Sequence, residues 1–450
     1  MTEQKQVIPK GFKLTEVGLI PEDWQIYKFG ELVNYKKGYP FKSADYSDFG
    51  TRIIRVSDTT YSTIEDSNPV YISVEEGKKY NAWELKAEDL VFSTVGSKPP
   101  MYDSLVGKVV MISDCHSGSL LNQNAVRIRS KSNAEGFQYL LLSHFRTKRY
   151  IDHIELIYRG NANQASITLE NLFEFKIPLP TNEKEQTAIA NALSDVDALI
   201  SELEKLIAKK QAIKTATMQQ LLTGKTRLPQ FALREDGTPK GYKASELGEI
   251  PEDWEVVLTG QICDVLTGFP FPSSMYSNTG VRLLRGSNVK RNCTDWDDSI
   301  TEYWPELTSN LKQYELSIGD IAISMDGSLV GRSFAQLSEN DLPAVLLQRV
   351  ARLRGKLISQ NYLKEWICSK FFTEHCDAVK TVTAIPHISP SDINNFKILK
   401  PSTEDEQSVI ALTLSNMDDE IQTLQQRLNK TRQIKQGMMQ ELLTGKTRLI

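Results

Sequence analysis

An internal duplication constrains the fold of this chain more than any other feature. Segment 9–24 begins with PKGFK and ends with GLIPEDW, and segment 239–254 begins with PKGYK and ends with GEIPEDW. A second pair is identical, because 221–228 and 442–449 both read LLTGKTRL. Such self-similarity predicts two structurally similar halves related by a pseudo-twofold axis. The first LLTGKTRL leads into the next PKG and the second stands at the carboxyl end, so the repeat closes on itself in a circular order.

Two bodies of differing sequence, 18–180 and 248–401, lie between the repeated flanks. Each mixes short apolar runs with one longer helical stretch, 137–154 in the first body and 362–378 in the second. This mixture predicts α/β domains, and 450 residues are too many for a single core. The bodies share only scattered pairs, among them Asp89/Asp320, Ser93/Ser324, Gly96/Gly327 and Ser97/Ser328.

Each body is followed by a stretch in which apolar residues recur at steps of four and three, the pattern of a helix seam. Neither 183–222 nor 404–443 contains Pro, so each predicts one helix of about 40 residues and roughly 60 Å. Thr181 or Asn182 and Thr403 are the expected N-caps, and Gly224 and Gly445 the expected stops. The seam positions are Ile189, Leu193, Val196, Ile200, Leu203, Ile207, Ile410, Leu414, Met417, Ile421, Leu424 and Leu428.

Two matched seams pack most economically on each other, and twofold symmetry makes them antiparallel; the alternative is that each seam lies on its own domain. The expected fold is therefore mixed α/β, with two similar globular domains separated by two long antiparallel coiled-coil helices in a pseudo-twofold circular arrangement. The predicted parts are an N-terminal arm (1–17), the first body (18–180), a central spacer helix (181–228), a linker (229–247), the second body (248–401) and a C-terminal spacer helix (402–450).

Composition excludes several classes of function. The formal net charge is −4, which argues against a bulk electrostatic binder of nucleic acid, so any DNA contact must be local or shared with a partner. The chain has no long uncharged apolar run, and its first ten residues are polar, so we expect a cytoplasmic protein without membrane contact. The five cysteines form no CxxC pair and are expected to be buried thiols.

No catalytic or metal centre is visible in the sequence. The five histidines occur singly, without an HExxH pattern, and we expect neither a metal nor a cofactor in this chain. Gly224-Lys225-Thr226 resembles the end of a phosphate loop, but Gln219 and its twin Gln440 stand where the first glycine is required. These glycines are better explained as helix stops.

Four duplicated motifs together resemble the specificity subunit of type I restriction-modification systems, and the likeness covers essentially the whole chain. They are the GxIPxxW segments, the GYPF-type loop at 38–41 and 268–271, the PxxxxEQ helix starts and the LLTGKTRL helix exits. The resemblance implies two target-recognition domains, each reading one half of a bipartite double-stranded DNA site. It also implies that the helices bind two methyltransferase subunits and set the spacer between the half-sites.

The same resemblance implies that this chain is not an enzyme but a non-catalytic subunit of an adenine-N6 methyltransferase and ATP-dependent endonuclease complex. S-adenosylmethionine, ATP and Mg would then belong to partner subunits, which include the restriction or translocase subunits of the full complex. The alternative function is a pseudo-dimeric interaction scaffold that assembles partners without reading DNA.

Candidate DNA contacts are polar side chains in Gly-bracketed stretches of the bodies, since Arg, Lys, Asn, Gln, Ser and Thr read base edges and hold phosphates. The polar run 158–166, a predicted loop between a helix and a strand at Ile167, is the strongest of these segments. Asp23, Trp24, Asp253 and Trp254 are assigned to structure instead. The predicted contacts are Lys42, Ser43, Arg55, Ser57, Thr94, Lys98, Arg159, Asn161, Asn163, Gln164, Ser273, Arg285, Asn288, Lys290, Arg291, Ser328, Arg332, Thr381 and Thr383.

Overall fold

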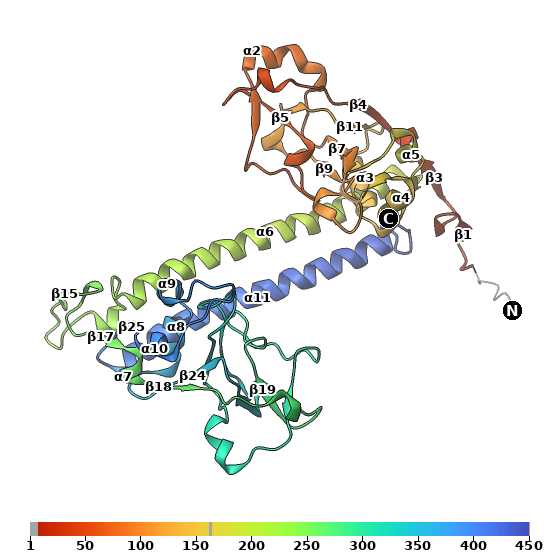
Figure 1. Ribbon diagram of the computed structural model, residues 1–450. Coiled ribbons are helices and arrows are strands. Elements are labelled where there is room, and N and C mark those ends of the chain that lie inside the picture. The colour runs from red at the N-terminus through yellow and green to blue at the C-terminus, as the bar shows by residue number, and fades with distance from the viewer. Residues whose placement is uncertain (1–7, 162–163, 450) are drawn as a thin grey trace. The chain divides into compact units, whose positions relative to one another are not determined.

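The computed structural model describes residues 8–161 and 164–449 (Figure 1). The chain divides into two compact units, each built from one body and parts of both long helices. Unit 1 comprises Met1–Glu204 and Gln426–Ile450, and unit 2 comprises Lys205–Gln425. In the described part, no helix is both long and apolar enough to span a bilayer.

Unit 1 is organised around a four-stranded antiparallel sheet in the order β4–β11–β7–β9. The four residues of β7, one of its two interior strands, are all buried. A second sheet, β10–β5–β6, and a third, β12–β13–β8, extend the body. The strands are β4 (Val33–Lys37), β5 (Thr51–Ile54), β6 (Val70–Ile72), β7 (Leu90–Ser93), β8 (Val95–Gly96), β9 (Val109–Met111), β10 (Leu120–Leu121), β11 (Ala125–Ser130), β12 (Arg159–Asn161) and β13 (Gln164–Ser166).

The core of unit 1 joins the body to both long helices. Residues of β3 (Trp24–Lys28) and β14 (Lys176–Pro180), which pair antiparallel, are buried together with α3 (Phe137–Phe145), α4 (Lys148–Ile157) and α5 (Leu169–Phe173). Ile189 and Leu193 enter this core from the first long helix, and Leu442 and Leu443 enter it from the end of the second. Segments from opposite ends of the chain therefore complete one core, as the circular repeat predicts.

Unit 2 repeats this topology. Its sheets run β18–β24–β21–β22 and β20–β19–β23, which match the four-stranded and the second sheet of unit 1 strand for strand. Met218, Leu222, Ile410 and Leu414 of the long helices lie in its core. The elements are β17 (Glu255–Leu258), β18 (Cys263–Thr267), β19 (Val281–Leu284), β20 (Tyr303–Trp304), β21 (Ile321–Ser324), β22 (Phe334–Gln336), β23 (Ala344–Leu346), β24 (Val350–Gly355), α8 (Gln360–Ile367), α9 (Lys370–Val379), α10 (Pro390–Asn394) and β25 (Lys397–Lys400).

The two long helices are α6 (Glu183–Leu222) and α11 (Glu404–Leu442), with the predicted lengths. Asn182 caps α6 by accepting the Lys184 N–H at 3.0 Å, and Thr403 caps α11 by accepting the Glu406 N–H at 3.3 Å. Both helices stop before a glycine with positive φ, +68° at Gly224 and +70° at Gly445. The caps and stops predicted from the sequence are thus confirmed.

Ion pairs show that α6 and α11 are antiparallel within each unit. In unit 1 Asp197 pairs with Lys435, and Glu204 further along α6 pairs with Arg432, which is earlier on α11. In unit 2 Lys210 pairs with Glu420, and Lys214 pairs with Asp418. All twelve seam positions are buried or half-buried. Coiled-coil packing as such stays a prediction.

Three local expectations were wrong. The helical stretches 137–154 and 362–378 are each two helices, because Thr147 and Ser369 start a new one. The predicted loop before Ile167 is the β12–β13 hairpin, and Ile167 itself is in no strand. Cys115 and Cys293 are exposed, not buried, since they lie in turns outside the sheets.

Candidate nucleic-acid interface

Two predicted contact segments of the first body lie in one small sheet. β8 pairs with β13, and β13 pairs with β12, so Thr94–Lys98 and Arg159–Gln164 are brought together. The Thr94 hydroxyl donates to the Asn124 carbonyl at 2.9 Å, which fixes the turn before β8. Lys98 and Arg159 are exposed, and neither forms an ion pair within the described residues. Asn161 and Gln164 are paired in the backbone register of the hairpin, and Asn163 lies outside the described residues.

The other candidates of the first body divide into free and committed side chains. Lys42 and Ser43 are exposed and free in the described structure, and Ser57 is exposed but its hydroxyl donates to Asp58 at 3.4 Å. The Arg55 guanidinium instead donates to Asp58 at 2.6 Å and to the Asn68 carbonyl at 2.7 Å, so it braces a turn of its own body. The hydrogen bond to Asp58 raises the pKa of Arg55, as expected for a guanidinium held by a buried carboxylate.

In the second body, the stretch 285–291 is mostly occupied in internal contacts. Arg285 pairs with Glu302 at 3.2 Å and Lys290 pairs with Asp295 at 3.5 Å. Asn288 is fully buried, because its amide accepts the Arg285 N–H and donates to the Asp295 carbonyl. Its assignment to DNA contact was therefore wrong, since a side chain without exposed surface cannot meet a base edge. Arg291 is exposed.

The remaining candidates of the second body surround the segment 380–387. An isolated bridge between Asp326 and His387 brings this segment next to the turn that carries the exposed Ser328. Arg332 pairs with Asp377 at 2.6 Å on α9, and this contact lowers the pKa of Asp377. Thr381 and Thr383 hold the segment by hydrogen bonds to His387 at 2.9 Å and to the Ile385 carbonyl at 2.7 Å. Ser273 lies apart and is exposed.

The bodies therefore differ in the side chains that they offer to a partner. Among the predicted contacts, Lys42, Lys98 and Arg159 are exposed cations of the first body without an ion pair in the described part, and Arg291 is such a cation in the second. Segment 380–387 instead exposes apolar side chains, with Val382 and Ile385 among the most exposed large hydrophobic residues. A polar hairpin and an apolar loop thus occupy the same place in the two bodies.

Sequence reasoning missed one feature of each unit, an arginine cluster that ties a helix end to the body. In unit 2, Arg227 donates to Glu406 at 2.7 Å and to Asp253 at 2.7 Å, and the Trp254 indole N–H donates to Glu406 at 3.3 Å. Lys240 also donates to Asp253, at 2.9 Å. These bonds and the positive charges lower the pKa of Asp253 to about 2 although burial opposes the shift.

Unit 1 holds a corresponding cluster, in which the buried Trp24 indole N–H has no hydrogen-bond partner among the described residues. Arg448 donates to Glu185 at 2.7 Å and to Asp23 at 2.8 Å, beside Trp24. A Cβ on Gly445 would lie 2.4 Å from Pro21, as one on Gly224 would lie 2.5 Å from Pro251, so the repeated Thr-Gly-Lys-Thr-Arg run packs closely on the repeated Ile-Pro-Glu-Asp-Trp run. Trp24 and Trp254 are both buried. Their structural assignment is confirmed. The sequence signal for the clusters was the repetition of Glu185 as Glu406 and of Arg227 as Arg448.

No group of three or more His, Cys, Asp or Glu side chains within the described ranges is arranged to hold a metal ion. What the geometry offers is a pair of similarly framed bodies whose outward segments differ in chemistry.

Comparisons with known proteins agree with one another. The family model described as the type I restriction modification DNA specificity domain matches residues 21–215 and 251–433, once in each half. The chain is 27% identical to the Type I restriction enzyme MjaVIII specificity subunit of Methanocaldococcus jannaschii, over 96% of this chain and 94% of the relative. It is 34% identical to the Type I restriction enzyme EcoAI specificity subunit of Escherichia coli, over 39% of this chain and 29% of that protein. Among solved structures, a type I restriction-modification S subunit from M. genitalium has the same fold, with a TM-score of 0.58, 15% identity, and coverage of 96% of this chain and 97% of that one.

Proposed function

Because this chain belongs to the type I restriction-modification DNA specificity family, we propose that each of its bodies reads one half of a bipartite DNA target. The family is one of specificity subunits and is generally non-catalytic. One observation carries the division of labour: both bodies have the same strand order in their two main sheets, yet their outward segments differ in side-chain chemistry. Two readers on one frame suit a target made of two different half-sites.

The helices have a second role in this proposal. Their seams form an antiparallel coiled coil that sets the spacer between the half-sites, and their constant ends bind two methyltransferase subunits. S-adenosylmethionine, ATP and Mg bind to partner subunits, the restriction subunits join the same complex, and the complex works in the cytoplasm. The repetition of α6 and α11 supports this role, since identical partners require equivalent docking surfaces.

Methylation-motif sequencing in a host that expresses this chain with its methyltransferase tests the proposal. Substituting the exposed Lys98 and Arg159 by Ala should relax the first half-site and leave the second unchanged, because a base contact is worth about 1–3 kcal/mol. Arg291→Ala should do the converse. Arg332→Ala is the matched control, since its guanidinium is engaged by Asp377. A scaffold would show no half-site effect, and loss of both half-sites at unchanged complex assembly would refute one half-site per body.

The spacer role has its own test. Inserting four residues into α6 between 199 and 210 and into α11 between 420 and 431 adds roughly 6 Å of helix, nearly two base pairs of axial rise. The recognised spacer should lengthen accordingly in sequenced methylation motifs. An unchanged spacer in a complex that still methylates would show that the helices do not set the distance.

A further inference from the structure

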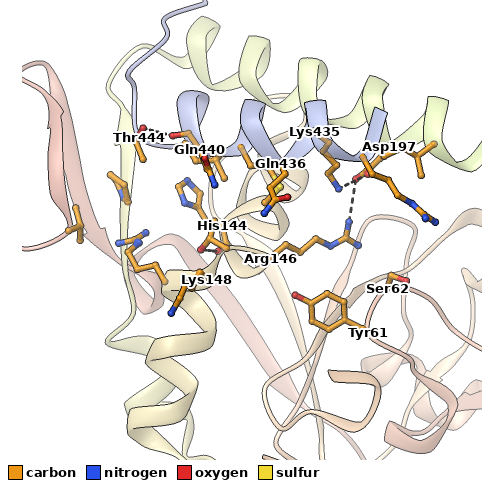
Figure 2. Close-up of a pocket in the computed structure, with 18 of the residues that line it drawn as sticks. Tyr61, Ser62, His144, Arg146, Lys148, Asp197, Lys435, Gln436, Gln440 and Thr444 are labelled. Carbon is orange, nitrogen blue, oxygen red and sulfur yellow. Dashed lines mark hydrogen bonds and ion pairs between the residues drawn. The ribbon is translucent and has the colours of Figure 1, made fainter. Parts of the chain in front are cut away.

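Unit 1 contains a cavity of about 650 Å³ where the turn between α3 and α4 faces the last turns of α11 (Figure 2). Its polar wall is rich in cations: Arg146 comes from the turn, Lys148 and Arg149 from the start of α4, and Arg432 and Lys435 from α11. Asp197 is the carboxylate that lines it. Tyr61, Ile200, Met439 and Leu443 supply apolar surface. The cavity thus combines a positive wall with room for a larger apolar group, as small-molecule sites commonly do.

The carboxylate of Asp197 does not neutralise this wall. It accepts from Lys435 at 2.5 Å and from Arg146 at 3.3 Å, and it also accepts the Tyr139 hydroxyl. Figure 2 shows Arg146 and Lys435 both reaching the Asp197 carboxylate. The single Asp197 carboxylate therefore balances only one of the two positive charges that contact it. In addition, the buried Arg146 Nε has no hydrogen-bond partner in the part of the chain that the structure describes. Lys148 and Arg432 each have a carboxylate of their own, Asp152 and Glu204.

Arg149 is the second uncompensated charge. Its guanidinium donates to the Lys176 carbonyl at 2.7 Å and lies 4.9 Å above the Phe175 ring, but no carboxylate in the described part of the chain pairs with it. Burial lowers the pKa of Arg149 to about 10. Confined cations without a counter-ion are costly, and they are retained most readily where an anion binds.

The matching place in unit 2 shows that the charge is not part of the repeated frame. Arg149 is the second residue of α4, and Phe371 is the second residue of α9. His144 and Trp366 are the penultimate residues of α3 and α8, and Arg146 and Cys368 follow those helices. The cavity of about 440 Å³ in unit 2 is lined by Trp366 and Phe371. The arginines that line the cavity of unit 1 are therefore not required by the fold at this place.

We propose that the cavity of unit 1 binds a phosphate-bearing ligand whose phosphate is held by Arg149, while Arg146 and Lys435 add positive charge to the same wall. Two uncompensated positive charges match a dianion better than a monoanion, and guanidinium groups bind phosphate oxygens in pairs. The apolar side of the cavity receives the remainder of the ligand. The phosphate belongs either to a free nucleotide or to the backbone of target DNA, and both sources make the same contacts.

Calorimetric titration of the full chain tests the phosphate contact without reference to DNA recognition, so its failure would leave the proposed function intact. Inorganic phosphate should bind at an ionic strength where sodium chloride and acetate do not. Arg149→Phe, which copies the residue of unit 2, should weaken this binding about tenfold or more. Lys370→Ala, which removes an exposed cation of unit 2, should leave it unchanged. Binding of acetate equal to that of phosphate, or unchanged phosphate binding by Arg149→Phe, would overturn the proposal.

Two further arms identify the source of the phosphate. If it is a free nucleotide, adenosine monophosphate should bind more tightly than inorganic phosphate, and adenosine should bind weakly. If it is DNA, Arg149→Phe in the methyltransferase complex should reduce the dependence of DNA affinity on salt by about one phosphate contact. Arg146→Met repeats the titration should Arg149→Phe fail to fold. The absence of any phosphate effect beyond that of chloride in the wild-type chain would refute the site by itself.

Discussion

The two units differ least in the segments that are repeated in the sequence. They differ most in the side chains that line a cavity or face the solvent. Arg227 and Arg448 have the same partners in the same geometry, a helix-start glutamate and the aspartate before the buried tryptophan. The cavities beside these clusters are cationic in unit 1 and aromatic in unit 2. Residues that hold the frame are thus repeated, while residues that meet a ligand are free to diverge.

Equal partners do not make the two arginine clusters energetically equal. The Arg227 side chain is 7% exposed, whereas that of Arg448 is 30% exposed. Asp253 is 22% exposed, whereas Asp23 is 54% exposed. Water screens charges in the more open cluster, so the same ion pairs should contribute less to stability in unit 1.

The largest expected effect is therefore on unit 2. Arg227→Ala should lower its stability by about 3–5 kcal/mol, because it leaves the buried Glu406 without a counter-charge. Arg448→Ala should cost unit 1 less, about 1–3 kcal/mol: Glu185 is as buried as Glu406, but water reaches Arg448 and Asp23 and already weakens their ion pairs. Hydrogen exchange measured by mass spectrometry resolves the units, with peptides around Trp254 and Trp24 as reporters. Equal losses in both variants would show that exposure does not decide the strength of the clusters.

Acid should sharpen the same contrast. The pKa of Asp253 is lowered to about 2 from its ordinary value of 3.8, so the folded state holds the proton more weakly than the unfolded state. The resulting stabilisation, about 2 kcal/mol, is present above pH 3.8 and is lost as the pH falls through 2. Asp253→Asn should therefore destabilise unit 2 at pH 6 but hardly at pH 2. Asp23→Asn, the matched variant, should show a smaller difference between these pH values in the same exchange measurement.

Much of this architecture could be predicted because the repeat encodes it directly. The seams follow from apolar spacing, and the helix ends follow from Asn182, Thr403 and the glycines, since these signals are local. The breaks at Thr147 and Ser369 were missed because each continues an apolar helical pattern, and a hydroxyl is a weak cue within such a pattern. The common sheet order of the two bodies was not predicted, since strand pairing depends on contacts distant in sequence.

The candidate site was harder to predict for a different physical reason. Polarity in a loop indicates an exposed side chain but not a free one. Arg55 and Arg332 resemble DNA contacts in the sequence. However, Arg55 pairs with Asp58, which is near in the chain, and Arg332 pairs with Asp377, which is distant. Asn288 resembles a base reader, yet its amide closes a buried turn. Whether a polar group is already satisfied is decided by tertiary packing, which composition and spacing do not record.

The smallest expected effect concerns the helix seam, where Asp197 and Asp418 occupy equivalent positions on α6 and α11. Asp197 is bound by Lys435 and Arg146 and also accepts the Tyr139 hydroxyl, whereas Asp418 is bound by the two lysines Lys214 and Lys364. Tyr139→Phe should lower the stability of unit 1 by about 1 kcal/mol, because the ring remains packed and a single hydrogen bond is lost.

The counterpart of Tyr139 is Asn361, since each follows a glutamine whose amide donates to a strand carbonyl, Gln138 to Ile128 at 3.1 Å and Gln360 to Leu353 at 3.1 Å. Asn361 accepts a hydrogen bond from the half-buried Gln336, and no hydrogen bond joins it to Asp418 in the described structure. Asn361→Ala should therefore leave the exchange of 414–421 unchanged, while Tyr139→Phe should speed the exchange of 193–200. Equal responses would mean that the hydroxyl contributes nothing specific to unit 1, and that the two seams are held by their lysines alone.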